Sequence, residues 1–150
     1  FAELSGNETV LDLYCGTGTI AIWLAGQAAE VIGLELVESA VLDARKNCRT
    51  NGIDNCSFIL GDIKDTLQTI SQVPDLLVID PPRAGMHKDV VQAVLSMAPE
   101  KIVYVSCNPA TMARDFLELK TRYRMEAVQP VDMFPHTFHI EAVAKLKKIG

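Results

Sequence analysis

The residue best suited to chemistry in this chain of 150 residues is Cys107, in the stretch Ser106-Cys107-Asn108-Pro109. A Val/Ile-rich run precedes it, and Asn108 and Pro109 are typical of the N-cap and the first position of a helix. The thiol should therefore lie at a strand end, beside the positive end of a helix, where the thiolate is favoured. Such a thiolate can act as a nucleophile. The alternative is a small buried hydrophobic residue.

A turn rich in glycine occupies residues 12–19, with the sequence DLYCGTGT. Glycine lets a backbone approach a ligand closely, and ligands of open α/β sheets bind beyond the carboxyl ends of the strands. Glu35 follows Gly16 by 19 residues and ends the next expected strand, where a carboxylate could accept both hydroxyls of a ribose. Asp62 could meet an adenine amino group, or cap a helix that starts at Ile63.

Two classes of cofactor fit this turn. Gly16, Gly18 and Ala21 also satisfy the dinucleotide fingerprint, so a nicotinamide-dependent oxidoreductase is an alternative. Asp12 argues against the oxidoreductase, because a carboxylate inside the first strand is unfavourable beneath a negatively charged pyrophosphate. The same carboxylate can hold the ammonium group of an amino-acid-like cofactor. Together with Glu35, it favours S-adenosylmethionine over a dinucleotide.

A stiff loop follows the fourth expected strand at residues 80–85, with the sequence DPPRAG. Two prolines remove two backbone donors, which leaves carbonyl groups for a ligand. Arg83 suits a phosphate or a uracil carbonyl. Methyltransferases that act on exocyclic amines usually end the comparable loop in an aromatic residue, so Arg83 argues against that chemistry. A plain turn is the alternative.

The last candidate segment covers residues 132–141, with the sequence DMFPHTFHIE. Strand alternation would put His139 and Glu141 on one face, where Glu141 could be a general base. A metal site made of His136, His139 and Glu141 has no recognisable zinc spacing, and we predict no metal. A surface carboxylate on an edge strand is the alternative for Glu141.

Short Val/Ile/Leu-rich runs alternate with amphipathic stretches, which indicates a mostly parallel sheet covered on both faces. The last two strands have no helix between them, so an antiparallel end is expected. The predicted strands are 9–14, 30–35, 56–60, 75–79, 101–106, 124–131 and 140–147. The predicted helices are 19–26, 38–51, 63–70, 87–97 and 110–121.

Composition fits one domain, since 49% of the residues are hydrophobic. Residues 1–75 hold 4 Lys/Arg against 11 Asp/Glu, and residues 76–150 hold 10 against 8. This balance is far from that of a free-standing nucleic-acid binder, so an RNA substrate would need help from another segment. The four cysteines form no disulfide framework, and no long apolar span occurs, so we expect a monomeric, cytoplasmic protein without membrane contact.

Five motifs together resemble the catalytic domain of the RNA 5-methyluridine (uracil-5-) methyltransferases, which modify tRNA or rRNA. They are the DLYCGTGT turn, the GLE of residues 33–35, DPPRAG, SCNP, and FPHT followed by Glu141. The resemblance implies an α/β, Rossmann-like class I methyltransferase fold with a mostly parallel seven-stranded sheet and an antiparallel last strand. It also implies that residues 1–150 are the C-terminal part of a longer protein, without its N-terminal RNA-binding barrel and central segment.

The resemblance further implies roles for single residues. Cys107 would be the nucleophile and Glu141 the base that removes the carbon-5 proton, with RNA bound mainly through the missing segments. The candidate contacts to S-adenosyl-L-methionine are Asp12, Tyr14, Gly16, Gly18, Thr19, Glu35, Asp62 and Asp80. The candidate contacts to the substrate are Pro81, Arg83 and His136. The remaining alternatives are an amino- or small-molecule methyltransferase and a non-catalytic cofactor-binding remnant.

Overall fold

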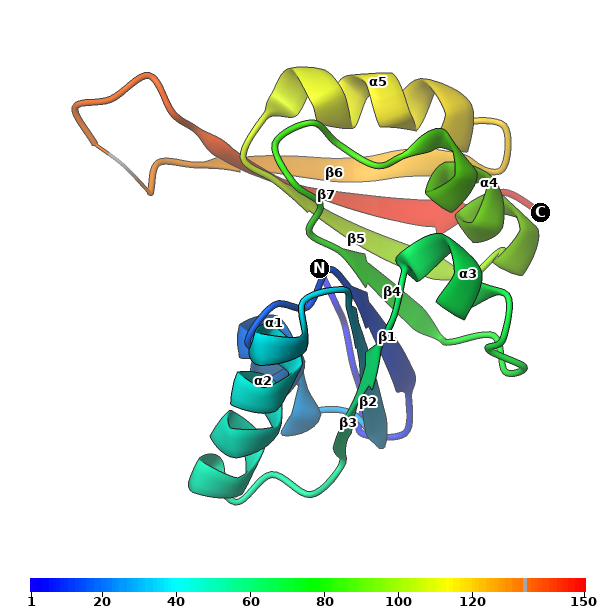
Figure 1. Cartoon of the computed structure of the whole chain (residues 1–150). Coiled ribbons are helices and arrows are strands. Elements are labelled where there is room, and N and C mark those ends of the chain that lie inside the picture. Colours follow the sequence, from blue (N-terminus) through cyan, green and yellow to red (C-terminus); the bar gives the residue numbers. More distant parts are fainter. Residues whose placement is uncertain (134) are drawn as a thin grey trace.

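Seven strands form one sheet in a computed structural model that describes residues 1–133 and 135–150 (Figure 1). Their order across the sheet is β3-β2-β1-β4-β5-β7-β6. The strands are β1 (Thr9–Leu13), β2 (Glu30–Glu35), β3 (Cys56–Leu60), β4 (Leu76–Ile79), β5 (Lys101–Ser106), β6 (Tyr123–Val131) and β7 (Glu141–Lys148). Strands β1 to β5 pair in parallel, whereas β7 runs antiparallel to both β5 and β6. The predicted sheet is thereby confirmed.

Five helices connect the strands. They are α1 (Thr19–Ala25), α2 (Glu38–Asn51), α3 (Ile63–Leu67), α4 (Lys88–Met97) and α5 (Pro109–Leu119). Helix α3 ends three residues before the predicted boundary, because the amides of Thr69 and Ile70 bond to carbonyls three residues back in a tighter turn. None of the helices in the described part of the chain is both long and apolar enough to span a membrane.

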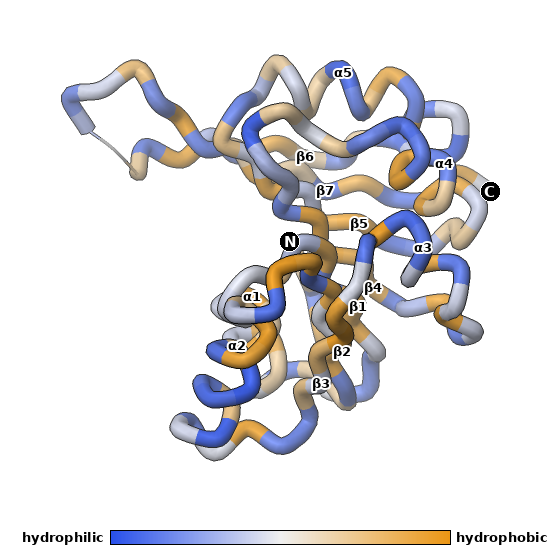
Figure 2. Tube along the Cα trace, viewed as in Figure 1, coloured by the Kyte–Doolittle hydropathy of each residue, from blue (hydrophilic) through white to orange (hydrophobic). Residues whose placement is uncertain are grey.

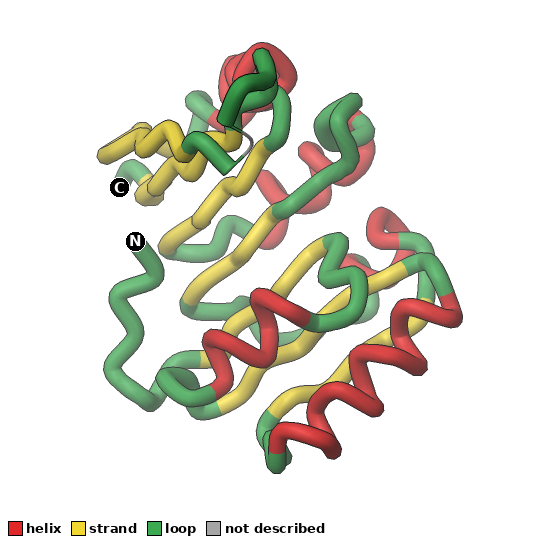
Figure 3. The backbone as a smooth tube through the Cα atoms, turned by 90° about the vertical axis from the view of Figure 1, so that its left-hand side faces the viewer, coloured by secondary structure: helices red, strands yellow, loops and turns green. Residues whose placement is uncertain are grey.

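The helices cover both faces of the sheet, as the turned view shows (Figure 3). Helices α1 and α2 pack on one face and α3, α4 and α5 on the other, each against its own cluster of buried side chains. Hydrophobic residues are gathered along the central strands (Figure 2), as expected for strands buried on both faces. The first cluster centres on Val10, Ala21, Leu24, Val41 and Ala44, and the second on Leu11, Ile63, Val91, Tyr104 and Met112.

Candidate active site

Cys107 lies between a strand and a helix, as predicted. Strand β5 ends at Ser106, and α5 begins at Pro109. Asn108 is the N-cap, and its side-chain oxygen accepts a hydrogen bond of 3.2 Å from the Ala110 amide. Cys107 itself is half-buried, so its thiol is partly accessible at the amino end of α5.

Strand pairing places the start of β7, at Glu141, beside the end of β5. Ser106 of β5 pairs with Ala142 of antiparallel β7. Cys107 directly follows Ser106, and Glu141, the first residue of β7, directly precedes Ala142, so the two residues flank the last pair of this ladder on the same side. Asp80 lies at the end of the neighbouring strand β4, where burial, and next the charge of Glu141, raise the pKa of its carboxyl group. Asp80 and Cys107 therefore follow the carboxyl ends of β4 and β5, and Glu141 begins the antiparallel β7 at the same edge of the sheet.

The segment before β7 differs from the sequence-based prediction. Strand β7 begins at Glu141, so His139 lies in the preceding loop and does not alternate with Glu141 along a strand. His136 is exposed with a left-handed φ of 70°, and no hydrogen bond within the described residues links it to Cys107 or Glu141. Phe134, part of the predicted FPHT motif, lies outside the described residues. The described residues contain no group of three or more potential ligands arranged for a metal.

The DPPRAG loop is tied to the helix that follows Cys107. Asn108 Nδ2 and Thr111 Oγ1 both donate to the Arg83 carbonyl, each at 3.3 Å. One turn further along α5, Arg114 Nη2 donates to the Ala84 carbonyl at 2.9 Å. Helix α5 therefore fixes the position of the loop relative to the thiol at its own amino end.

Asp115 anchors this connection from inside the protein. Its side chain is only 3% exposed, and Oδ2 accepts hydrogen bonds from the Met86 amide at 2.8 Å and the Tyr104 hydroxyl at 2.6 Å. Its other oxygen pairs with Arg114 Nη2 at 2.6 Å. Charge-assisted bonds of this kind compensate the burial of a carboxylate. Asp115 therefore holds β5, α5 and the loop together.

Sequence reasoning missed Asp115, although a signal was present. The buried residues of α5 are Met112, Asp115 and Leu119, spaced three and four positions apart. A carboxylate on the apolar stripe of an amphipathic helix requires a buried partner. That spacing would have marked Asp115 as a structural anchor.

The prolines and Arg83 have different environments. Pro81 is buried and Pro82 is exposed, and the Pro82 carbonyl accepts a hydrogen bond of 2.7 Å from the Gly85 amide. This carbonyl is therefore used within the turn, contrary to the expectation that it is left for a ligand. The Arg83 side chain is exposed, and its Nη1 lies 3.2 Å from His139 Nδ1.

Glu35 holds the glycine turn against the end of β2. Its Oε2 accepts from the Gly16 amide at 2.9 Å, and its Oε1 accepts from the Leu36 and Val37 amides at 2.8 and 2.9 Å. A carboxylate offers about four acceptor positions, so these three amides leave about one for a ligand hydroxyl. The expectation that Glu35 accepts both hydroxyls of a ribose would require one amide to be released.

The turn itself is shaped by close packing. Gly18, the N-cap of α1, has a φ of 83°, and a Cβ there would lie 2.9 Å from the Phe58 ring. Tyr14 adopts a left-handed φ of 61°, a strained conformation for a residue with a large side chain. This conformation ends β1 one residue before the predicted boundary. Thr19, the first residue of α1, is exposed.

Asp12 is buried without compensation. Its side chain is 0% exposed, and neither carboxylate oxygen has a hydrogen-bond partner of good geometry among the described residues. Burial, and then the charge of Asp80, raise the pKa of Asp12 to about 7. The backbone amide of Ala21 has a smaller effect, which lowers this pKa. Such a group is a candidate partner for a ligand cation.

A cavity of about 330 Å³ adjoins the glycine turn. It is lined by the predicted residues Tyr14, Glu35 and Asp62, and by Leu36, Val37, Ile63, Pro82, His87 and Val90, which sequence reasoning did not select. Asp62 also caps α3, because its Oδ1 accepts from the Lys64 amide at 3.1 Å, so the predicted alternative role is present too. The apolar residues carried no signal beyond ordinary hydrophobicity, since only the fold brings them together.

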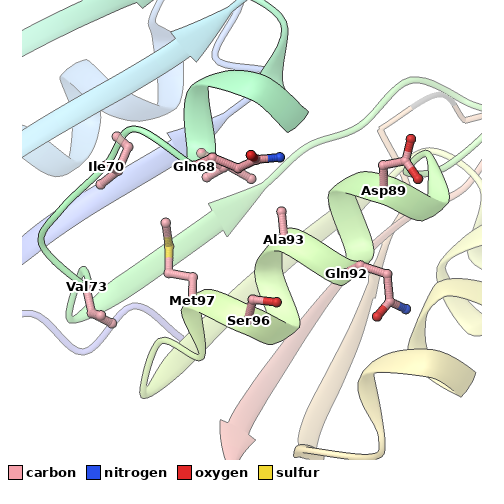
Figure 4. Close-up of a pocket in the computed structure, with 9 residues that line it drawn as sticks. Gln68, Ile70, Val73, Asp89, Gln92, Ala93, Ser96 and Met97 are labelled. Atoms are coloured by element: carbon pink, nitrogen blue, oxygen red, sulfur yellow. The ribbon is translucent and has the colours of Figure 1, made fainter.

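A larger cavity, of about 510 Å³, lies between the end of α3 and α4 (Figure 4). Among its lining residues only Asp89 is charged, and none is a predicted site residue. The side chains of Ile70, Ala93 and Met97 give it an apolar wall (Figure 4). This cavity has no arrangement of groups for catalysis.

The other cysteines are poor candidates for a nucleophile. Burial raises the pKa of both Cys15 and Cys56 to about 12, with a further contribution from the Asp12 charge at each. Burial also raises the pKa of Cys48. Because the thiolate is the reactive form, these three side chains suit packing rather than attack on a substrate.

Comparison with known proteins identifies the family of this chain. A model of the family described as tRNA (uracil-5-)-methyltransferase matches residues 3–149. An RNA methyltransferase of Bacteroides thetaiotaomicron, described as uncharacterized, is 54% identical over 151 residues, which cover 98% of this chain and 33% of that protein. A relative with the same description from Nitratidesulfovibrio vulgaris is 50% identical over 97% of this chain and 32% of its own length.

One solved structure combines similar fold and sequence. The tRNA (uracil-54, C5)-methyltransferase of Pyrococcus abyssi, in complex with S-adenosyl-L-homocysteine, has a TM-score of 0.85 and 41% identity over 97% of this chain and 36% of that one. TrmN of Thermus thermophilus, with a TM-score of 0.80 and 21% identity over 99% of this chain and 46% of its own, shares the fold alone.

Strand order, the antiparallel β7 and the glycine turn define a class I methyltransferase fold. Within that class, the chain belongs to the tRNA (uracil-5-)-methyltransferase family, because the family model matches nearly all of it. The predicted fold and family are confirmed. The chain spans about a third of the length of the curated relatives that it matches.

The loop anchor can be tested at Gly85, which has a φ of 79°. A Cβ there would lie 2.5 Å from Arg114 Nη2 and 2.8 Å from Asp115 Oδ2. We expect Gly85→Ala to lower the free energy of unfolding by about 2 kcal/mol or more, measured by urea denaturation. The control is Gly52→Ala, with a φ of 65° and nothing within 4 Å, which should cost only about 1 kcal/mol of backbone strain. Equal losses would show that the anchor is not tightly packed.

Burial of Asp12 predicts a dependence of stability on pH. Its pKa of about 7 in the folded protein lies above the ordinary value of 3.8, so the folded state holds the proton more tightly. Its contribution to stability is therefore full below about pH 4 and is lost as the pH rises through 7. We expect Asp12→Asn to remove this decline, so the variant gains stability relative to the wild type between pH 4 and 8. Denaturation at several pH values measures it, with exposed Asp54→Asn as control. A constant difference between wild type and Asp12→Asn would contradict the assignment.

Proposed function

We propose that this chain is the catalytic domain of an RNA methyltransferase that transfers a methyl group from S-adenosylmethionine to carbon 5 of a uridine in tRNA or rRNA. The observation that supports the proposal is the β5–β7 register, whose last pair, Ser106–Ala142, is flanked by Cys107 and Glu141. A half-buried thiol and a carboxylate that flank the same strand pair would supply both a nucleophile and a base.

The cofactor-binding part of the proposal rests on the glycine turn and the cavity beside it. Asp12 lacks a hydrogen-bond partner among the described residues, and Asp80 lies near it, so their negative charge suits the ammonium and sulfonium groups of S-adenosylmethionine. The apolar walls of the cavity suit the adenine ring of the cofactor. The Glu35 carboxylate would bind the ribose, and the Asp62 carboxylate would bind the adenine amino group. The residues therefore fit this cofactor. In the similar Pyrococcus abyssi structure, the bound molecule is S-adenosyl-L-homocysteine.

Carbon 5 of uracil is a poor nucleophile, and the reaction must first activate it. In the proposed mechanism, the Cys107 thiolate adds to carbon 6, which makes carbon 5 an enolate carbon. When bound, the cofactor supplies an electrophilic methyl group to that carbon. Glu141 then accepts the carbon-5 proton, and the electron pair re-forms the double bond between carbons 5 and 6 as the Cys107 sulfur leaves.

Substrate recognition is proposed to come largely from outside this chain. The net charge of −5 offers few phosphate contacts over residues 1–150, while the mildly basic second half includes Arg83 near the site. Residues 1–150 would then be the C-terminal part of a longer enzyme. The modified RNA can be identified by mass mapping of 5-methyluridine in tRNA and rRNA from a strain that lacks the gene.

Cofactor choice gives the first functional prediction. We expect S-adenosylhomocysteine to bind more tightly than NAD in calorimetry, because a pyrophosphate would be repelled by Asp12 and Asp80. Asp12→Asn should weaken S-adenosylhomocysteine by about tenfold, since a charged hydrogen bond to its ammonium group is lost. The exposed Asp54→Asn variant should bind like the wild type. Tighter binding of NAD would favour the oxidoreductase alternative.

The second functional prediction separates Cys107 from Glu141 in the full-length enzyme. Cys107→Ala should keep cofactor binding and yield neither product nor a covalent RNA adduct. Glu141→Gln should accumulate a methylated protein–RNA adduct, because the bond to carbon 6 forms but the carbon-5 proton stays, and turnover should fall about 10²- to 10⁴-fold. Denaturing electrophoresis with methyl-labelled cofactor detects both results.

The matched control for the thiol is Cys15→Ala, which should still form the adduct. Normal turnover in Glu141→Gln would show that Glu141 is a surface carboxylate and not the base. Methylation that survives Cys107→Ala would favour an amino- or small-molecule methyltransferase. If the wild-type protein binds the cofactor but methylates neither tRNA nor rRNA, the non-catalytic remnant becomes the favoured alternative.

A further inference from the structure

An aromatic side chain is exposed to solvent three residues before Glu141 in the sequence. Phe138 is 86% exposed, more than any other large hydrophobic side chain in the described part of the chain. It lies in the segment that joins β6 to β7, which projects from the body of the domain (Figure 1). A single exposed phenylalanine has no meaning by itself. Its neighbours give this one a context.

Phe138, His139 and Arg83 form a continuous row, which we call the mouth row. The rings of Phe138 and His139 are 4.2 Å apart between centroids and tilted by 41°. His139 Nδ1 lies 3.2 Å from Arg83 Nη1. Because arginine can only donate, Nδ1 must be the acceptor, and the neutral ring then carries its proton on Nε2. The row therefore combines an aromatic face, an imidazole N–H donor and a guanidinium group.

The mouth row is attached to both chain segments that carry the proposed catalytic residues. The Arg83 carbonyl accepts hydrogen bonds from Asn108, which directly follows Cys107, and from Thr111, three residues further along the chain. His139 precedes Glu141 by two residues. The row therefore borders the place where a target uracil would lie between thiol and carboxylate.

The chemistry of this row fits a nucleobase with its phosphate. A single-stranded base stacks on an aromatic face regardless of its identity, and arginine pairs with phosphate oxygens. One N–H of Arg83 is used by His139, which leaves four donors. The reacting uracil must lie inward, against Cys107, so the ring exposed at the edge suits a base that stays outside. A uridine taken out of its stack leaves its neighbours without a stacking partner.

We infer that the mouth row binds the nucleotide next to the target uridine, with its base stacked on Phe138 and its phosphate on Arg83. This inference rests on the proposed function, since it requires an RNA substrate at this site. It adds a second base-binding position that would act on substrate affinity rather than on the chemical step.

The test uses the full-length enzyme and a synthetic RNA stem-loop that contains the uridine found by mass mapping. We expect Phe138→Leu to raise the KM for RNA by about 5- to 50-fold with kcat changed less than about twofold, because leucine keeps apolar surface but cannot stack. Phe138→Trp should retain the wild-type KM. Affinity for S-adenosylhomocysteine should be unchanged in both variants. The matched control is Trp23→Leu, at a side chain that is 75% exposed on α1, which should leave the KM unchanged.

Abasic substitution identifies the stacked nucleotide. When the RNA lacks the base on one side of the target uridine, the wild-type enzyme should have the KM that Phe138→Leu has on intact RNA. The same abasic RNA should not raise the KM of Phe138→Leu any further. The inference is overturned if Phe138→Leu has the wild-type KM, or if its KM rises by the same factor on intact and on both abasic RNAs. A loss of thermal stability in Phe138→Leu would also overturn the inference, because it would show that the Phe138 ring packs against another part of the full-length protein. A wild-type enzyme that methylates no RNA overturns the proposed function and this inference together.

Discussion

Backbone pairing between β5 and β7 is the constraint on which the site depends. The antiparallel register runs from Lys101–Lys147 to Ser106–Ala142, and Cys107 and Glu141 directly flank its last pair. A slip of one residue would turn Glu141 to the other face of the sheet, since side chains alternate along a strand. Strand β6 holds β7 from its other side, over residues 141–148. Sheet pairing on both sides therefore fixes the backbone of β7, and with it the start of this strand at Glu141, relative to the end of β5.

A second connection fixes the substrate side of the site. Helix α5 starts two residues after Cys107 and bonds to the DPPRAG loop through Asn108, Thr111 and Arg114. Asp115 joins the same helix to the loop and to β5 inside the core. Buried charged groups with several partners are costly to rearrange, so loop, helix and thiol behave as one rigid unit. Such rigidity suits the proposed reaction, in which a base would be held close to the Cys107 sulfur.

Local strain and uncompensated charge are concentrated near this edge of the sheet. Tyr14 has a positive φ, and Asp12 is buried without a hydrogen-bond partner among the described residues. Burial is the main cause of the raised pKa of both Asp12 and Asp80, and the charge of Asp80 adds to the first shift as the charge of Glu141 adds to the second. A protein selected only for stability would avoid this row of carboxylates, which costs free energy in the absence of a cation. Its negative potential suits a positively charged ligand.

The sequence by itself determined the alternation of strands and helices, the turn at Gly16 and Gly18, and the N-cap at Asn108, because each depends on local propensity and periodicity. It could not determine that β7 inserts between β5 and β6, that Glu35 is engaged by three amides, or that Asp115 anchors the loop. These facts depend on contacts between residues far apart in the chain, whose geometry exists only after the sheet and its helices have packed. The sequence thus indicated which groups could react, and the tertiary structure decided which of them meet.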